Sequence, residues 1–164
     1  MSEVLAENTQ NSLEAIPRVP TREQIYRLQA EIAKLPQVEP ETEHFFVPGM
    51  YCRSVFRKAG TLIVGKVHKA DHFFICAAGE IIAWSEKGMR HMKSGDVIES
   101  KPGTKRVTFA LTDAVGITVH KTDLTDLDEI EEELIEPDAG ALFDSGNKLK
   151  KPALELVKEL EVKS

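Results

Sequence analysis

Residues 60–79, GTLIVGKVHKADHFFICAAG, and residues 94–107, SGDVIESKPGTKRV, carry most of the information about the fold. In the first stretch the side chains alternate along a predicted strand, so we expect Val64, Lys66 and His68 on one face of it. An apolar run and a glycine then indicate a second strand and a turn. The second stretch has the pattern of turn, short strand, turn and strand. Both stretches therefore predict β structure.

The same pattern extends from residue 45 to residue 122. Short runs of Val, Ile, Phe and Thr are separated by glycine- and proline-containing turns every 8 to 15 residues. This spacing is typical of a sandwich or barrel. We expect eight short strands, near residues 51–57, 61–68, 72–77, 80–85, 89–92, 96–99, 105–111 and 114–121.

A helix is predicted before the β region. Thr21 and Gln24 fit a capping box, in which each side chain bonds a backbone donor at the start of the helix. Pro36 ends the helix. A narrow apolar seam runs along it, made of Ile25, Leu28, Ile32 and Leu35. A helix this short is marginal alone in water, so the seam packs either on the barrel wall or on a partner subunit.

Beyond the β region the chain is acidic and then amphipathic. Residues 123–144 hold ten acids and no Lys or Arg. Leu127, Ile130 and Leu134 form one apolar stripe, which predicts a helix with an acidic outer face. A last amphipathic helix is expected at 149–160. The expected organisation is an N-terminal arm and helix at 1–44, a barrel at 45–122 and a helical extension at 123–164.

The composition narrows the range of functions. At 41% hydrophobic and 29% charged residues, with a net charge of −6, it is typical of a soluble globular protein. No apolar run is long enough to cross a membrane, and the first residues do not form a secretory signal. Two cysteines do not make a disulfide framework. With 6% aromatic residues and no basic stripe, we expect neither a nucleic-acid partner nor a membrane partner.

The two quoted stretches resemble the two motifs of the cupin family, whose small jelly-roll barrel carries its chemistry inside. The resemblance implies a mainly β, cupin-type jelly-roll barrel with an N-terminal helix and C-terminal helical extensions. It also implies ligand positions on the inner face. His68 matches one metal-binding histidine of the family, but Lys66 replaces the other and His72 stands at the glutamate position. Arg106 occupies the place of the last metal-binding histidine.

Two cations at the usual ligand positions argue against a metal, because each repels a dication at close range. We therefore expect no metal or other cofactor. If a metal binds, its ligands are expected to be His68, His72 and His120. The alternative is an anion site, since Lys and Arg bind carboxylate or phosphate by charge-assisted hydrogen bonds. Its expected residues are Lys66, His68, His72, Lys105 and Arg106. Lys66 and Arg106 can equally reach water at the barrel mouth or pair with acids.

A longer resemblance covers residues 45–138. The run from VPGMYCR through GTLIVGKVHKADH and PGTKRV to DLTDLDEIEEELIEPD resembles small cupin-like proteins of tailed bacteriophages. It implies a non-enzymatic, homo-oligomeric virion structural or accessory protein that acts through its terminal arms. Other phage structural proteins are then further possible partners, and the location is the virion or the host cytoplasm. The alternative functions use the barrel interior. They are a metal-independent isomerase or epimerase, or a binding protein for a small anion such as a nucleotide or sugar phosphate.

Overall fold

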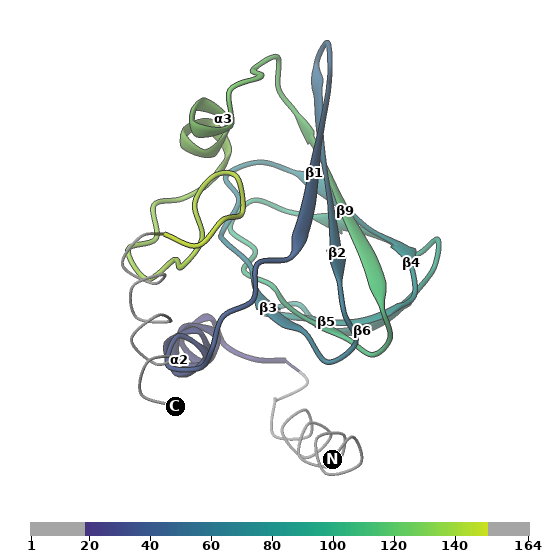
Figure 1. Cartoon of the computed structure of the whole chain (residues 1–164), viewed down its shortest axis with the longest axis vertical. Coiled ribbons are helices and arrows are strands. Elements are labelled where there is room, and N and C mark those ends of the chain that lie inside the picture. The colour runs from purple at the N-terminus through teal and green to yellow at the C-terminus, as the bar shows by residue number, and fades with distance from the viewer. Residues whose placement is uncertain (1–18, 151–164) are drawn as a thin grey trace.

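Nine antiparallel strands form two facing sheets in this computed structural model, which describes residues 19–150 (Figure 1). The expected arm at 1–18 and nearly all of the expected last helix lie outside these residues. The strands are β1 (Glu41–Val47), β2 (Met50–Arg57), β3 (Leu62–Val64), β4 (His72–Ala78), β5 (Glu80–Ser85), β6 (Gly88–Lys93), β7 (Val97–Ser100), β8 (Val107–Ala110) and β9 (Ala114–Lys121). The mainly β prediction is confirmed.

One sheet has five strands in the order β1-β2-β9-β4-β7, and the other has four in the order β3-β8-β5-β6. Neighbours that are far apart in sequence, such as β2 with β9 and β3 with β8, give the crossed connections of a jelly roll. The core between the sheets consists of Phe74, Cys76, Ile81, Ala83, Met92, Ala110 and Ala114. Side chains alternate between the inner and outer faces along each strand, so the inner face of each sheet lines the barrel interior.

Helix α2 (Arg22–Ile32) covers the outer face of the four-stranded sheet. Its capping box is present, with Thr21 accepting from the backbone of Gln24. Ile25 is 1% exposed and packs among Trp84, Val107 and Phe109. The apolar seam therefore packs on the barrel wall, which was one of its two expected partners. Leu35, the last residue of the expected seam, lies beyond the helix and is exposed.

Helix α3 (Leu127–Leu134) lies near one end of the barrel, beside the ends of β2 and β9. Ile130 and Leu134 pack against Tyr51 of β2, as the apolar stripe predicts. The chain after α3 returns along the barrel toward α2 (Figure 1). Within the described residues, neither helix has the length and apolar character needed to cross a membrane.

Three sequence predictions need correction. Strand β1 was not predicted, because its exposed, charge-rich pattern Glu41–Val47 depends on pairing with β2. The strand expected at 61–68 is only Leu62–Val64, because the chain leaves the ladder at Gly65. Val64 packs with the cluster beneath α2 and does not share a face with His68.

Candidate metal and anion site

Three histidines from three separate segments meet at one end of the barrel interior. His72 begins β4, and His120 lies near the end of β9 on the same face of the five-stranded sheet. His68 lies in the segment after β3, where it forms an isolated bridge with Ile135. Backbone alternation fixes the first two, since Phe73 pairs with Val119 and both neighbouring histidines then point inward.

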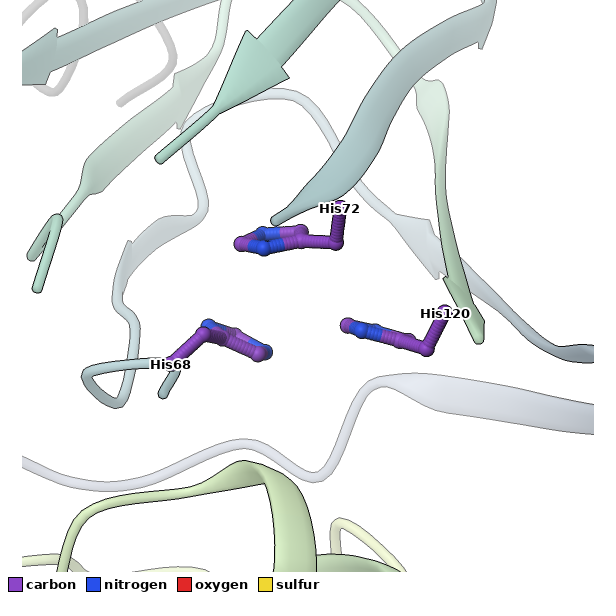
Figure 2. Close-up of side chains that lie close together, drawn as sticks. All are labelled: His68, His72 and His120. Carbon is purple, nitrogen blue, oxygen red and sulfur yellow. The ribbon is translucent and has the colours of Figure 1, made fainter. Parts of the chain in front are cut away.

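The three imidazole rings lie close together and face one another (Figure 2). Their centroids are 4.0 Å apart for His68 and His72, 5.0 Å for His68 and His120, and 4.9 Å for His72 and His120. One ring nitrogen from each residue lies within 4.8 Å of the other two. Three nitrogen donors thus surround one small volume.

The environment keeps these imidazoles neutral. Burial, together with the charges of Arg106 and Arg53 and against the raising effect of the hydrogen bond to Ala70, lowers the pKa of His72 to about 4. Burial, with His72 and Arg53 close by, lowers the pKa of His120 to about 3. Burial also lowers the pKa of His68 well below 6.5, helped by the other two histidines. Neutral imidazole is the form that binds a metal.

The three histidines fit a divalent transition metal. Nε2 of His68 and Nε2 of His72 are inaccessible to solvent and have no hydrogen-bond partner. A buried, unpartnered nitrogen costs free energy unless something binds it. Three imidazole ligands with positions left open are also the donor set of several catalytic zinc sites. His68, His72 and His120 are therefore the residues that would hold a metal in this fold.

Two of the cations expected in the anion site are bound by carboxylates of the chain. Lys66 is ion-paired with Glu131 of α3, at the edge of the cavity. Lys105 is 0% exposed and lies beneath α2, because consecutive residues of an extended segment point to opposite sides. Its ammonium donates to Gly65 O at 3.0 Å and lies 3.4 Å from Asp138. Lys105 thus fastens the segment around Asp138 to the barrel.

Arg106, in contrast, points into the barrel. It donates to the hydroxyl of Ser100. Ser100 is the residue opposite His72 in the register of the β4–β7 ladder. Its guanidinium carbon lies 4.8 Å from the centroid of the Phe74 ring. Of the five residues expected in the anion site, the structure brings together His68, His72 and Arg106.

A cavity of about 490 Å³ extends from the histidines through the barrel interior. Its walls are formed by the inner faces of β2, β9 and β4, and by Arg106 and Thr108. The end of α2, residues 35–40 and residues 141–147 line its opening. The cavity is therefore large enough for a small organic molecule beside the three histidines.

The sequence reasoning missed two arginines in this cavity, Arg53 and Arg57 of β2. Residues 51, 53, 55 and 57 alternate with outward residues, so a strand face with two arginines was visible as a pattern. Such a face is ordinarily the solvent side of a strand. Only the pairing of β2 with β9 places it inside the barrel.

No family model matches this sequence, and no curated protein matches it. Similar solved structures do exist. Salicylate 1,2-dioxygenase from Pseudaminobacter salicylatoxidans superposes with a TM-score of 0.50 at 10% identity, over 68% of this chain and 35% of that one. The fold is a cupin-type jelly roll. KdgF from a Halomonas species has a TM-score of 0.47 at 16% identity, over 54% of this chain and 82% of that one. An RmlC-like cupin from Shewanella frigidimarina has a TM-score of 0.45 at 13% identity, over 51% of this chain and 76% of that one.

One of these neighbours is named a cupin and another a dioxygenase. At such identities the likeness concerns the fold alone. The same barrel carries unrelated activities, so a function for this chain has to be argued from its own cavity.

Proposed function

We propose that this protein is a metal-binding cupin that holds a small anionic molecule in its barrel, beside a metal bound by His68, His72 and His120. The observation that supports it is the convergence of three imidazoles, of which His68 and His72 line a cavity of about 490 Å³ and His120 lies beside them. This replaces the expectation that no metal binds. That expectation rested on Lys66 and Arg106, and Lys66 is neutralised by Glu131.

The residues have separable roles in this proposal. The three histidines bind the metal through ring nitrogens, and the strand ends of β4 and β9 fix two of them in place. Arg106 stays protonated near His72 and favours a ligand with negative charge. The segments around the opening limit the access of water to the cavity. A metal bound there would act as a Lewis acid toward a ligand oxygen.

Metal binding can be tested directly. The chain, stripped of metal with a chelator and dialysed, is titrated with Co²⁺ and Zn²⁺ by calorimetry, and Co²⁺ binding is followed by its visible absorption. We expect one metal per chain in the wild type. His68→Gln and His120→Gln should each weaken binding by tenfold or more. His91→Gln is the matched control, because His91 is exposed on β6 and pairs only with Glu80.

Two results would overturn this proposal. One is the absence of saturable binding by the wild type with either metal. The other is equal weakening by His91→Gln and His120→Gln, which would place the metal elsewhere. If the wild type binds no metal but converts a sugar nucleotide in the presence of chelator, the metal-independent isomerase becomes the better interpretation.

A homo-oligomeric virion role remains a second proposal. It is supported by exposed apolar side chains on the outer face of the five-stranded sheet, namely Phe45, Val47, Met50, Phe73 and Val97. Contiguous exposed apolar surface is common at subunit contacts. The expected terminal contacts at 1–40 and 145–164 lie only partly within the described residues. Light scattering of wild type and of Phe45→Ser with Phe73→Ser would test this. A monomeric wild type would contradict it.

A further inference from the structure

We infer that Arg57, Thr118 and Arg106 form an anion-binding group in the cavity, which extends from beside the histidines toward Gly116 and holds a carboxylate or phosphate of the ligand. This deepens the proposed function by naming the class of ligand. The group itself does not depend on a bound metal, so the two proposals can fail separately.

Arg57 is a buried arginine whose hydrogen-bonding capacity is only partly used. It is 6% exposed and lines the cavity. Its Nη1 donates to the hydroxyl of Thr108 at 2.8 Å, while its buried Nε has no partner. Burial lowers its pKa to about 10, so it remains protonated at neutral pH. A buried, charged donor without a partner costs free energy that an anion would recover.

Arg57 and Arg106 both lie near the Phe74 ring. Arg106 stacks on the Phe74 ring. A Cβ on Gly116 would lie 2.7 Å from Arg57 Nη2 and 2.9 Å from Phe74 Cε2. The missing side chain of Gly116 therefore makes room for the Arg57 guanidinium to fold back against Phe74. Each guanidinium presents its N–H donors in the planar geometry that matches the oxygens of a carboxylate or phosphate.

Arg53, Arg57 and Arg106 make no ion pair with the described residues, and Glu86 is an acid whose charge acts on Arg106. Within residues 19–150, no carboxylate oxygen lies within 4.0 Å of Arg53, Arg57 or Arg106. Two acids also line the cavity. Asp138 is bound by Gln29 and Lys105, and one carboxylate oxygen of Asp144 accepts from two backbone amides.

Thr118 adds a second, independent sign of a polar ligand. It lies between Arg53 and Phe74 across the β2–β9–β4 ladders and faces the cavity. Its hydroxyl is buried and has no hydrogen-bond partner. A valine would fill the same volume without the free-energy cost of a buried hydroxyl that makes no hydrogen bond. A ligand that hydrogen-bonds to the hydroxyl explains why threonine stands here.

The anion group extends along the sheet away from the histidines, with Thr118 two residues from His120 on β9 and Gly116, beside which Arg57 lies, two residues farther. His120 and Gly116 are four residues apart on β9, which corresponds to about 13 Å of strand. Arg106 lies between the two ends, because it reaches both Ser100 opposite His72 and the ring of Phe74. The ligand expected is thus an elongated small molecule with an anionic group at its inner end and a polar group near the histidines.

The test measures binding of defined probes to the full chain by calorimetry and thermal shift. Succinate and inorganic phosphate distinguish the two kinds of anion, and succinamide is the uncharged match of succinate. We expect at least one anion to bind saturably and succinamide not to bind. Arg57→Gln and Arg106→Gln should each weaken that binding by about tenfold or more, as expected for lost charge-assisted hydrogen bonds. Arg90→Gln, which removes an exposed charge on β6, is the matched control and should bind as the wild type does.

Two further variants separate the possible outcomes. Thr118→Val should leave the free protein as stable as the wild type or more stable, while weakening anion binding. This variant keeps the test valid if Arg57→Gln does not fold. His120→Gln should lose the metal and keep the anion. The inference is overturned if no anion binds the wild type, or if Arg57→Gln and Thr118→Val bind it normally. It is also overturned if His120→Gln alone abolishes anion binding, since the anion would then be bound at the metal.

Discussion

Replacing Gly116 by alanine tests whether the inner end of the cavity is built as described. The new Cβ would lie 2.7 Å from Arg57 Nη2, and 2.9 and 3.2 Å from Cε2 and Cζ of Phe74. Ordinary contacts between such atoms are about 3.5–4.0 Å, so both groups must move by nearly 1 Å. Phe74 is buried in the core, and Arg57 is held by Thr108, so neither can move freely.

The expected cost follows from these contacts. Overpacking of a core costs about 1–3 kcal/mol. The lower chain entropy of the unfolded alanine variant returns about 0.4–1 kcal/mol. We therefore expect Gly116→Ala to lower the free energy of unfolding by about 1–2 kcal/mol, and to weaken anion binding as Arg57→Gln does.

Urea denaturation followed by circular dichroism measures this change. Gly65→Ala is the matched control, because its Cβ would meet nothing nearer than Arg106 O at 3.4 Å, and its cost should be within about 0.5 kcal/mol. In an Arg57→Met background the side chain no longer reaches Gly116, so the cost of Gly116→Ala should fall. Equal stability of Gly116→Ala and wild type, or the same cost in both backgrounds, would refute the packing described here.

Other predictions concern the segments that cover the barrel. Asp138→Asn should lower the free energy of unfolding by about 3 kcal/mol at pH 7, because it leaves the buried ammonium of Lys105 without its carboxylate. Burial by itself would raise the pKa of Asp138, but Gln29 and Lys105 lower it below 3.8. The stabilisation is therefore complete above pH 3.8 and is lost as pH falls through the lowered value, so wild type and Asp138→Asn should converge in acid urea titrations. Thr21→Ala should cost about 1 kcal/mol by removing the cap of α2. Ile25→Ala should cost about 2–4 kcal/mol in the same assay, since it empties a site beneath α2.

The sequence determined the elements whose signal is local. The turns at Gly79, Gly95 and Gly103 have positive φ, where glycine carries no steric penalty, and they divide the strands as expected. The capping box at Thr21 likewise involves groups only three residues apart. These features depend on backbone sterics and neighbouring side chains, which the sequence contains directly.

Only the tertiary structure decided what the inner face can bind. Lys66 and Arg106 looked equivalent as cations at ligand positions, yet Lys66 is paired with Glu131, which is 65 residues away, whereas Arg106 makes no ion pair with the described residues. Arg57 resembled a solvent-facing residue until β2 paired with β9 and Gly116 left space for its guanidinium. Charge pairing and burial depend on distances between segments remote in sequence. The electrostatic character of the cavity therefore emerges when the strands close around it, and no local pattern carries it.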